Sequence, residues 1–246
     1  MNLQQEVALV TGGARRIGAA IVRELHAQGM CVAIHCHRSV AAAEEISKEL
    51  NDLRPGSAKV VAAALNQVSA LKDLAETVYA HFGRLDVLVN NASSYYATPL
   101  TGLDESQFDD LIASNLKGPL FLSQACAARM SDGGRIINLL DVHARRPQAR
   151  FSAYLSAKAG LWSVTESLAL ELAPRVRVNG VAPGHMIWSD QGVLSAEEQD
   201  AELTRIPLSR LGGGAEIANA VSFLISPQAA YLTGAIIPVD GGLRLN

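Results

Sequence analysis

The sequence predicts an α/β protein, a single doubly wound domain whose parallel sheet has about seven strands and helices on both faces. Short β-branched runs alternate with longer amphipathic segments from one end of the chain to the other. The runs are apolar at successive positions, as expected of strands that are buried on both faces of a parallel sheet. No linker, repeat or shift in composition divides the 246 residues, so we expect one domain over residues 1–246.

The first half of the chain provides four strands and three helices. The strands are expected at Val7–Thr11, Cys31–His35, Lys59–Ala63 and Leu85–Asn90. Apolar residues recur at helical spacing after the first strand, and Gly29 ends that helix. The second helix spans 40–53, where Pro55-Gly56 closes it, and the third spans 69–82.

The second half begins with a long helical stretch at 105–130, in which Gly118-Pro119 predicts a bend. The fifth and sixth strands, 135–140 and 176–181, flank a helix at 152–172 that Pro174 stops. We expect residues 183–232 to form a substrate-loop region with one helix at 215–225, followed by a seventh strand at 235–239.

Composition excludes several classes of protein. Apolar residues make up 49% of the chain and charged residues 18%, which supplies a sizeable core and excludes intrinsic disorder. The net charge of −3 gives no electrostatic reason to bind nucleic acid or an anionic membrane. The three cysteines favour a reducing compartment over a disulfide framework. The first residues lack the pattern of a signal peptide, and no apolar run approaches the ~20 residues that span a bilayer. We therefore expect a soluble, cytoplasmic protein.

A glycine-rich turn, TGGARRIG at 11–18, follows the first strand. Ligands of a doubly wound sheet bind beyond the carboxyl ends of its strands. There Gly12, Ile17 and Gly18 would let the backbone approach a pyrophosphate at the start of a helix, as in a Rossmann-type nucleotide site. Arg16 occupies the middle glycine position of the pattern TGxxxGxG. Its guanidinium suits a contact with the pyrophosphate or with a substrate beside it, and a solvated surface position is the alternative.

The end of the second strand favours NADPH over NADH. Enzymes that use NADH place an acidic residue here for the ribose 2′-hydroxyl, whereas this chain has His37, Arg38 and Ser39, which suit a 2′-phosphate. A metal site at Cys31, His35, Cys36 and His37 is the alternative. Side chains alternate across a strand, and these spacings differ from zinc motifs, so we expect no metal.

Tyr154 and Lys158 lie four residues apart on the expected helix at 152–172 and therefore share one face. A phenol is a poor acid or base at neutral pH, and an adjacent ammonium favours its ionised form. The spacing alone also fits an ordinary solvated helix face. The functional interpretation of Tyr154 and Lys158 is favoured because their helix follows strands of a sheet whose first turn suits a nucleotide.

These motifs together resemble the short-chain dehydrogenase/reductase family over essentially the whole chain. They are TGGARRIG at 11–18, NNAS at 90–93, Asn115 in the long helical stretch, YLSAK at 154–158 and RVNGVAPG at 177–184. The resemblance implies hydride transfer from a nicotinamide, with Tyr154 as the proton donor. It implies that Lys158 lowers the pKa of that tyrosine and holds the nicotinamide ribose, and that Asn115 supports a proton relay. It also implies a homotetramer and cofactor contacts from Asn91, Ala92, Pro183 and Gly184.

Asp141 is the most informative departure from the family pattern. Thirteen residues before the tyrosine, most members place a serine that donates a hydrogen bond to the substrate carbonyl oxygen. An ionised carboxylate would oppose the negative charge that grows on that oxygen. A carboxylic acid able to give up a proton suits reduction of a C=N bond instead, because the nitrogen must be protonated. A displaced or structural aspartate is the alternative.

The same residues make the chain similar to the pteridine reductases within that family. The shared features are Arg16, IHCHRS at 34–39, NASSYYATPL at 91–100 and Asp141. The resemblance implies that Ser93 contacts both cofactor and pterin and that Tyr95 stacks on the pterin, with Arg16, Asp141 and Tyr154 completing the substrate site. Two π faces hold a flat heteroaromatic ring well. Tyr95 packing on the sheet edge is the alternative.

Other positions near this site stay open. Ala64 stands where the pteridine reductases usually have an aspartate for the adenine amino group, which leaves Asn66 as a candidate. Arg145, Arg146 and Arg150 would attract an anionic substrate tail or form a solvated or subunit-contact loop. His143, His185 and Trp188 lie in adjacent loops, and the sequence does not assign them roles.

The sequence therefore predicts an NADPH-dependent pteridine reductase that reduces a C=N bond of a dihydropterin such as dihydrobiopterin or dihydromonapterin, or dihydrofolate. A carbonyl reductase of the same family, acting on a 3-oxoacyl or sugar substrate, is the first alternative. A non-catalytic NADPH-binding sensor is the second, although it would not need Asn115, Tyr154 and Lys158.

Overall fold

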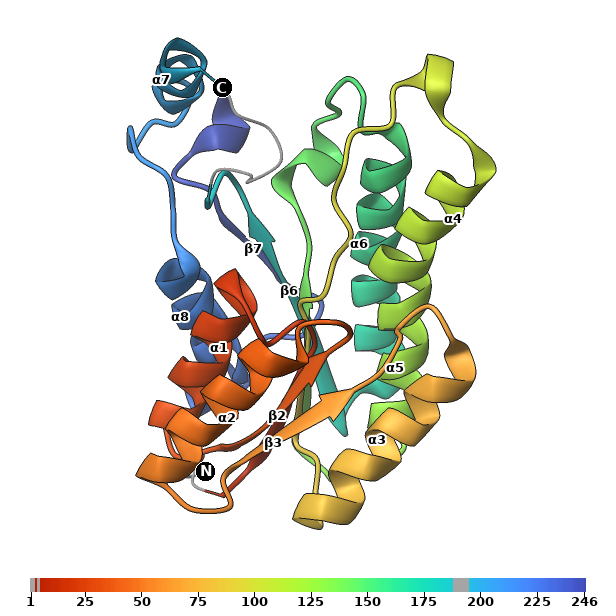
Figure 1. The fold of residues 1–246 in the computed structure, drawn as a ribbon, viewed down its shortest axis with the longest axis vertical. Coiled ribbons are helices and arrows are strands. Elements are labelled where there is room, and N and C mark those ends of the chain that lie inside the picture. Colours follow the sequence, from red (N-terminus) through yellow and green to blue (C-terminus); the bar gives the residue numbers. More distant parts are fainter. Residues whose placement is uncertain (1–2, 4, 188–194) are drawn as a thin grey trace.

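The computed structural model describes residue 3, residues 5–187 and residues 195–246. Its strands are β1 (Val7–Val10), β2 (Cys31–Cys36), β3 (Ala58–Ala62), β4 (Val87–Asn90), β5 (Gly134–Leu139), β6 (Val176–Pro183) and β7 (Ile236–Val239). Its helices are α1 (Arg16–Ala27), α2 (Val40–Leu53), α3 (Val68–Phe82), α4 (Glu105–Ile112), α5 (Gly118–Ala127), α6 (Ser152–Leu172), α7 (Ala196–Thr204) and α8 (Gly214–Ile225). Strands and helices alternate along the chain, as predicted (Figure 1).

The seven strands form one parallel sheet in the order β3-β2-β1-β4-β5-β6-β7. The chain moves outward from β1 to β3 and then crosses back to β4, so the order reverses between β1 and β4. In such sheets the ligand lies at the reversal, beyond the carboxyl ends of the strands. The topology therefore places the site at the ends of β1, β4 and β5.

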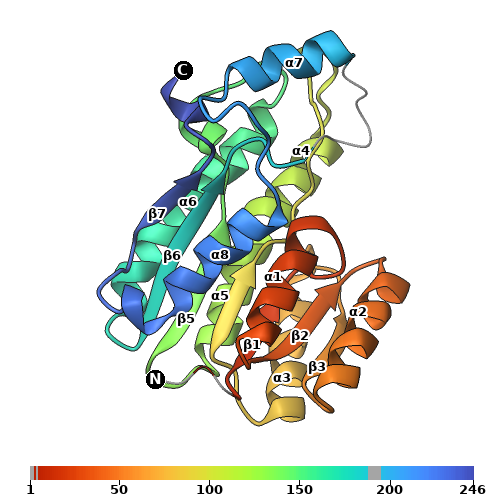
Figure 2. The same cartoon turned by 90° about the vertical axis from the view of Figure 1, so that its left-hand side faces the viewer.

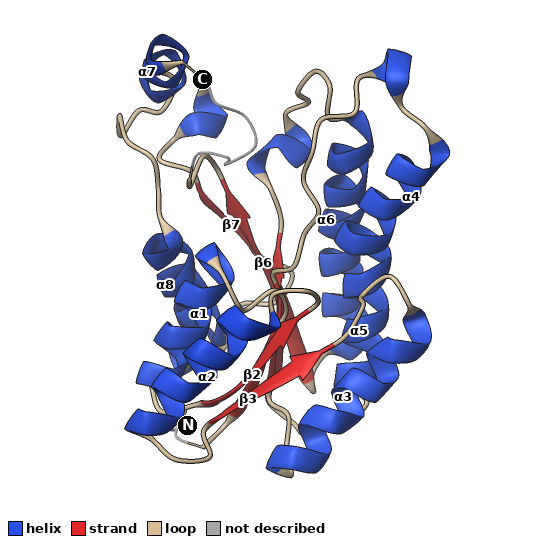
Figure 3. Cartoon of the chain, viewed as in Figure 1, coloured by secondary structure: helices blue, strands red, loops and turns tan. Residues whose placement is uncertain are grey.

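Helices cover both faces of the sheet (Figure 3). Helices α1, α2 and α8 lie on one face, and α3, α5 and α6 lie on the other (Figures 1 and 2). Successive residues of β1 serve the two faces, because Leu9 packs in the core under α3 and α5 while Val10 packs in the core under α1 and α8. The α/β doubly wound fold with a seven-stranded parallel sheet is thus confirmed.

Two segments differ from the sequence prediction. The stretch expected as one helix at 105–130 is α4, a π-helical turn at Ala113–Lys117 and α5, which ends at Ala127. The irregularity therefore precedes Gly118-Pro119. Gly118 instead lets the helix approach the loop after β3, since a Cβ there would lie 2.9 Å from the Leu65 carbonyl oxygen. Helix α7 lies within the expected loop region, and its sequence AEEQDAELT has no apolar period to reveal it.

No helix in the described ranges is both long enough and apolar enough to cross a membrane.

Candidate active site

The glycine-rich turn joins β1 to the start of α1 and is packed closely enough to require glycine. Gly12 has a left-handed φ of 62°, and a Cβ on Gly18 would lie 2.1 Å from the Gly12 carbonyl oxygen. Arg16 also has a positive φ, 52°, and is exposed at the first position of α1. Ile17 is half-buried beside it. The turn therefore offers exposed backbone and a helix N-terminus, which fits the pyrophosphate of a dinucleotide.

His35 fixes this turn to the neighbouring strands. The Gly12 backbone N–H donates to its Nδ1 at 3.2 Å, and its Nε2 lies 3.1 Å from the carbonyl oxygen of Ala63. This pairing requires the neutral ring with its proton on Nε2. Burial is the main reason that the pKa of His35 is lowered to about 4, and the nearby His37 lowers it further. The hydrogen bond to the Ala63 carbonyl oxygen acts in the opposite direction and only partly offsets these effects. The sequence named this histidine only as part of IHCHRS at 34–39 and as a rejected metal ligand, whereas the structure shows that it joins the turn to the end of β3.

The residues predicted for the 2′-phosphate lie beside this turn. His37 and Arg38 are exposed at the end of β2, and half-buried Ser39 precedes α2. The Gly13 N–H donates to the His35 carbonyl oxygen at 2.9 Å, so the end of β2 and the turn are held together. The structure thus brings the cationic end of β2 to the same edge of the sheet as the turn.

Asn91 and Ala92 complete the nucleotide side of the site at the end of β4. Asn91 Nδ2 donates to the Thr11 carbonyl oxygen at 2.8 Å, and the Ala92 N–H donates to Thr11 Oγ1 at 3.0 Å. A Cβ on Gly12 would lie 3.1 Å from the Ala92 Cα. These residues therefore shape the floor of the glycine-rich turn.

Pro183 and Gly184 lie at the end of β6, at the same edge of the sheet. The Gly184 N–H donates to the Val239 carbonyl oxygen at 3.0 Å, and a Cβ on Gly184 would lie 2.8 Å from the Asp240 Cβ. The close approach of β6 and β7 therefore requires a glycine at this position.

Asn115 sits fully buried in the π-helical turn. Its Nδ2 donates to the carbonyl oxygens of Ser94 and Leu111 at 2.9 and 3.0 Å, and Ser93 Oγ donates to its Oδ1 at 2.6 Å. The extra residue in the turn lets the side chain leave the helix and bind the loop after β4, and π-helical turns often occur at functional sites. Asn115 thus holds Ser93 in place.

Asp141, Tyr154 and Lys158 come together where β5 and α6 meet. The Tyr154 hydroxyl donates to Asp141 Oδ2 at 2.9 Å, and Lys158 Nζ donates to the Leu139 carbonyl oxygen at 2.8 Å. All three side chains are largely or fully buried, and Lys158 Nζ lies 5.8 Å from the centre of the Tyr154 ring. The structure therefore places the Asp141 carboxyl group against the Tyr154 hydroxyl.

The charge states in this cluster correct two sequence-based expectations. Burial, the Asp141 charge and their hydrogen bond raise the pKa of Tyr154 well above its ordinary value, so the expected lowering by Lys158 is not seen. Burial alone would raise the pKa of Asp141, but hydrogen bonds from His143 and Tyr154 outweigh it and hold the pKa below the ordinary value. Asp141 is therefore a carboxylate that accepts a hydrogen bond from the Tyr154 hydroxyl, and not the expected carboxylic acid.

Lys158 is also perturbed by its surroundings. Burial lowers its pKa to about 8, although the nearby Asp141 charge raises it. At neutral pH the ammonium form still predominates, and it compensates the Asp141 carboxylate.

Tyr95 lies directly beside the Tyr154 ring. The two rings meet edge to face with centres 4.9 Å apart, and Tyr95 stacks on Phe151 at 5.0 Å. Tyr95 remains 51% exposed, so one part of the ring is available to a further partner. The sequence did not single out Phe151, because nothing in its position signals a contact with the loop after β4.

Two of the neighbouring arginines have partners away from Asp141 and Tyr154. The Arg145 guanidinium lies 4.2 Å above the Trp162 ring and 3.6 Å from Glu166, and Arg146 donates to the Leu243 carbonyl oxygen at 3.1 Å. These contacts favour the interpretation as a structural loop over an anion-attracting mouth. Arg150 is exposed, with a φ of 71°. Trp188 lies outside the described residues.

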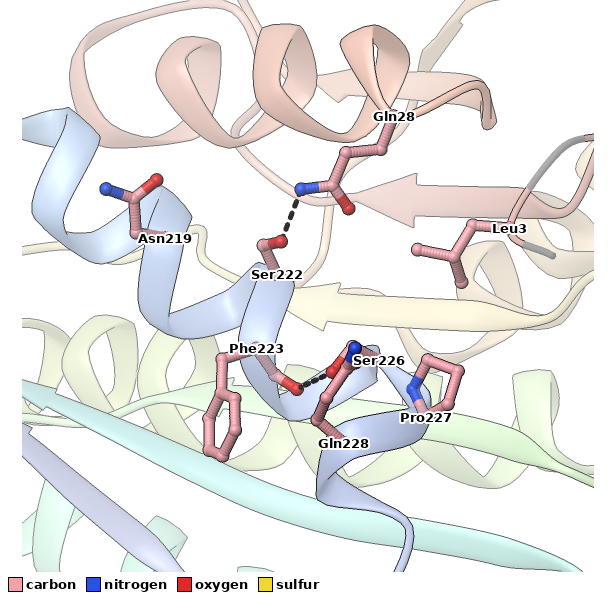
Figure 4. A pocket seen from close by; sticks show the side chains of 8 residues that line it. All are labelled: Leu3, Gln28, Asn219, Ser222, Phe223, Ser226, Pro227 and Gln228. Atoms are coloured by element: carbon pink, nitrogen blue, oxygen red, sulfur yellow. Dashed lines mark hydrogen bonds between the residues drawn. The ribbon is translucent and has the colours of Figure 1, made fainter. Parts of the chain in front are cut away.

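Across the described residues, no group of three or more His, Cys, Asp or Glu is placed to hold a metal ion. A surface hollow of about 580 Å³ lies away from the catalytic groups, beside the ends of α1 and α8 (Figure 4). It is lined by Leu3, Gln28, Asn219, Ser222, Phe223, Ser226, Pro227 and Gln228. These residues flank the amino ends of the strands, so the hollow is separate from the nucleotide edge.

Comparison with known proteins agrees with this geometry. Residues 12–244 match the family model described as enoyl-(acyl carrier protein) reductase. The chain is 38% identical to pteridine reductase 1 of Leishmania tarentolae over 97% of this chain and 96% of that protein. It is 35% identical to the 3-oxoacyl-[acyl-carrier-protein] reductase FabG of Escherichia coli over the full length of both. It is 37% identical to FabG of Staphylococcus aureus over 97% of this chain and 98% of that protein.

Proposed function

This chain belongs to the short-chain dehydrogenase/reductase family, and we propose that it is an NADPH-dependent pteridine reductase that reduces a C=N bond of a dihydropterin. Its relatives are named as reductases, which supports an enzyme over a non-catalytic sensor. The substrate class and the preference for NADPH go beyond what family membership gives, and they depend on particular side chains.

The contact between Asp141 and Tyr154 carries the proposal. A carboxylate 2.9 Å from the proton-donating hydroxyl puts a negative charge where a carbonyl reductase needs a neutral donor. A carbonyl oxygen gains negative charge as hydride arrives at its carbon, so Asp141 would oppose that reaction. A C=N nitrogen is basic enough to be protonated before the hydride arrives, so the Asp141 carboxylate would stabilise a cationic group that becomes neutral on reduction.

Ser93 and Tyr95 support a flat, polar substrate. The Ser93 hydroxyl is held by Asn115 at 2.6 Å, beside a Tyr95 ring that is still 51% exposed. A pterin offers a π face for Tyr95 and keto and amino groups for Ser93 and Arg16. An extended 3-oxoacyl chain would use neither the ring nor the guanidinium in this way.

The chain's own residues divide the remaining work. The glycine-rich turn would hold the pyrophosphate, and His37, Arg38 and Ser39 would hold the 2′-phosphate. NADPH, when bound, supplies the hydride for the substrate carbon. Tyr154 would donate the proton to the ring nitrogen, and Lys158 would offset the charge of Asp141 and bind the nicotinamide ribose. Asn115 positions Ser93 through the hydrogen bond described above.

The test is NADPH oxidation with dihydrobiopterin, dihydromonapterin, dihydrofolate and a panel that includes 3-oxoacyl thioesters and small ketones. We expect turnover of a dihydropterin and a loss of about 100-fold or more in Asp141→Ser. Asp132→Ser, at an exposed aspartate before β5, is the matched control and should retain full activity. Turnover of ketones or thioesters alone, unchanged or improved in Asp141→Ser, would leave a carbonyl reductase.

A 3-oxoacyl reductase is the second candidate, since FabG proteins are 35% and 37% identical to this chain. The thioester arm of the same panel decides between the two.

For assembly, we propose a homotetramer. Phe108 on α4 and Leu170 on α6 are 41% and 83% exposed, which suits helices that pack between subunits. Light scattering of the purified protein would test whether its molar mass is that of a tetramer.

For location, we propose the cytoplasm, because all three cysteines are unpaired in the structure.

A further inference from the structure

A row of ionisable side chains leads from Tyr154 to helix α7. Asp141 binds Tyr154 through Oδ2, and its Oδ1 lies 3.0 Å from His143 Nδ1. The His143 ring is 5.6 Å from the His185 ring, centre to centre, and His185 Nε2 lies 3.3 Å from Glu202 Oε2 on α7. None of the roles assigned above uses the two histidines.

The charge on Asp141 creates a problem for proton donation by Tyr154. The lowered pKa of Asp141 places the negative charge of the pair on the carboxylate, and burial together with this charge raises the pKa of Tyr154. If Tyr154 gave its proton to the substrate without replacement, two anions would lie within hydrogen-bonding distance. Lys158 offsets only one of them, and its ammonium is hydrogen-bonded to the Leu139 carbonyl oxygen. The site therefore needs a second proton source that contacts Asp141.

His143 has the right contacts to be that source. It binds Asp141 Oδ1 twice, through its backbone N–H at 2.8 Å and its ring Nδ1 at 3.0 Å. Because a carboxylate only accepts, Nδ1 must carry a proton. The side chain is 14% exposed, so the ring lies near the surface while its Nδ1 faces inward. These contacts also leave Oδ2 directed at Tyr154.

We propose that His143 positions Asp141 and supplies the proton that replaces the one given up by Tyr154. This inference rests on the reduction proposed above. In the step, the Tyr154 O–H bond breaks as the substrate N–H bond forms. The imidazolium of His143 first gives its Nδ1 proton to Asp141, and the neutral carboxyl group formed in this way then gives a proton to the phenolate oxygen. The hydride supplies both electrons, so Tyr154 and Asp141 return to their starting states and only His143 loses charge.

Several ionisable groups surround His143. Asp141 contacts its ring, His185 is the next ring along, and Glu202 lies beyond His185. Arg205 contacts Glu202 on the far side of this row. A relay that starts from a protonated His143 predicts a kcat that falls with rising pH, and this dependence should be lost when the imidazole is removed.

His143→Asn is the decisive variant, because the asparagine amide can still donate to Asp141 Oδ1 but does not titrate. We expect KM for the dihydropterin within about 2-fold of wild type and kcat at neutral pH lower by about 10-fold or more. The fall in kcat with rising pH should disappear, and added imidazole should restore part of the rate. His81→Asn, at an exposed histidine of α3, is the control and should behave as wild type. A kcat–pH profile in His143→Asn that coincides with wild type would overturn the proposal.

A measurement without turnover separates this inference from the proposed function. In protein with ¹⁵N-labelled histidine, the His143 Nδ1 proton should appear as a downfield, exchange-protected NMR signal that moves upfield in Asp141→Asn. A signal that is absent, or unchanged in Asp141→Asn, would refute the contact with Asp141. Lack of pterin turnover with the signal present would count against the proposed function alone. If His143→Asn unfolds, His143→Gln provides the same comparison.

Discussion

His35 should make the stability of this protein depend on pH in a specific way. The ring is 2% exposed and joins the glycine-rich turn to the end of β3 through both of its nitrogens. Its Nδ1 accepts from the Gly12 N–H, so protonation would place two donors face to face. Replacing His35 with glutamine keeps an amide that can accept and donate but removes the titration.

The size of the effect follows from the pKa of His35, which falls from 6.5 in the unfolded chain to about 4 in the folded protein. Because the folded value is the lower one, the unfolded state binds more protons between these values. The stabilisation is therefore complete above pH 6.5 and is lost as the pH falls toward 4. Between pH 7 and pH 4.5 this single group should remove about 2–3 kcal/mol from the free energy of unfolding.

The assay is urea unfolding of wild type and His35→Gln at both pH values, followed by circular dichroism. His26 and His185 also have lowered pKa values, mainly through burial, but they titrate in both proteins and cancel in the difference. We expect wild type to lose about 2–3 kcal/mol more than the variant on acidification. Equal losses in the two proteins would refute the neutral, buried His35 and its role in the turn.

Two further substitutions test the nucleotide edge. In Gly18→Ala the new Cβ would lie 2.1 Å from the Gly12 carbonyl oxygen. We therefore expect the free energy of unfolding to fall by about 1–3 kcal/mol and NADPH binding to be lost. Gly102→Ala, which meets no atom within 4 Å, is the control, and equal melting temperatures in the two variants would contradict the packing argument. Arg38→Asp should weaken NADPH binding by about 10-fold or more and leave NADH little changed, as measured by fluorescence titration. Lys72→Asp, an exposed position on α3, controls for net charge, and an equal loss for both cofactors would refute a 2′-phosphate contact.

Most of the sheet was predictable because buried parallel strands are apolar at every position, which is a local property of the sequence. The π-helical turn at 113–117 was not predictable in this way. It depends on Asn115 binding Ser93 and Ser94 in a loop about twenty residues away in sequence, and no pattern inside the helix encodes that contact. Helix α7 was missed for the opposite reason, since its residues are mostly polar and form no apolar face.

The candidate site was predictable wherever a motif fixes a residue type at a position. The glycine pattern of the turn predicts the positions of Gly12 and Gly18. The family spacing of thirteen residues before Tyr154 predicts that Asp141 belongs to the site. The protonation of Asp141 was not predictable, because it depends on a hydrogen bond from His143 and on burial by the surrounding loops. His35 was missed because its partners are backbone atoms, which leave no trace in the sequence.

Asp141 and His143 therefore have to be considered together. A serine at position 141 would be neutral and would donate a hydrogen bond, so Tyr154 could lose its proton beside Lys158 without meeting a second anion. Asp141 reverses this condition, because its charge adds to burial in raising the pKa of Tyr154 and makes proton loss harder. In the proposed relay, a proton passed from His143 to the other carboxylate oxygen removes that penalty at the moment of transfer. On this reasoning, Asp141→Ser should also make turnover independent of His143, so that adding His143→Asn to Asp141→Ser changes the residual rate by less than about 2-fold.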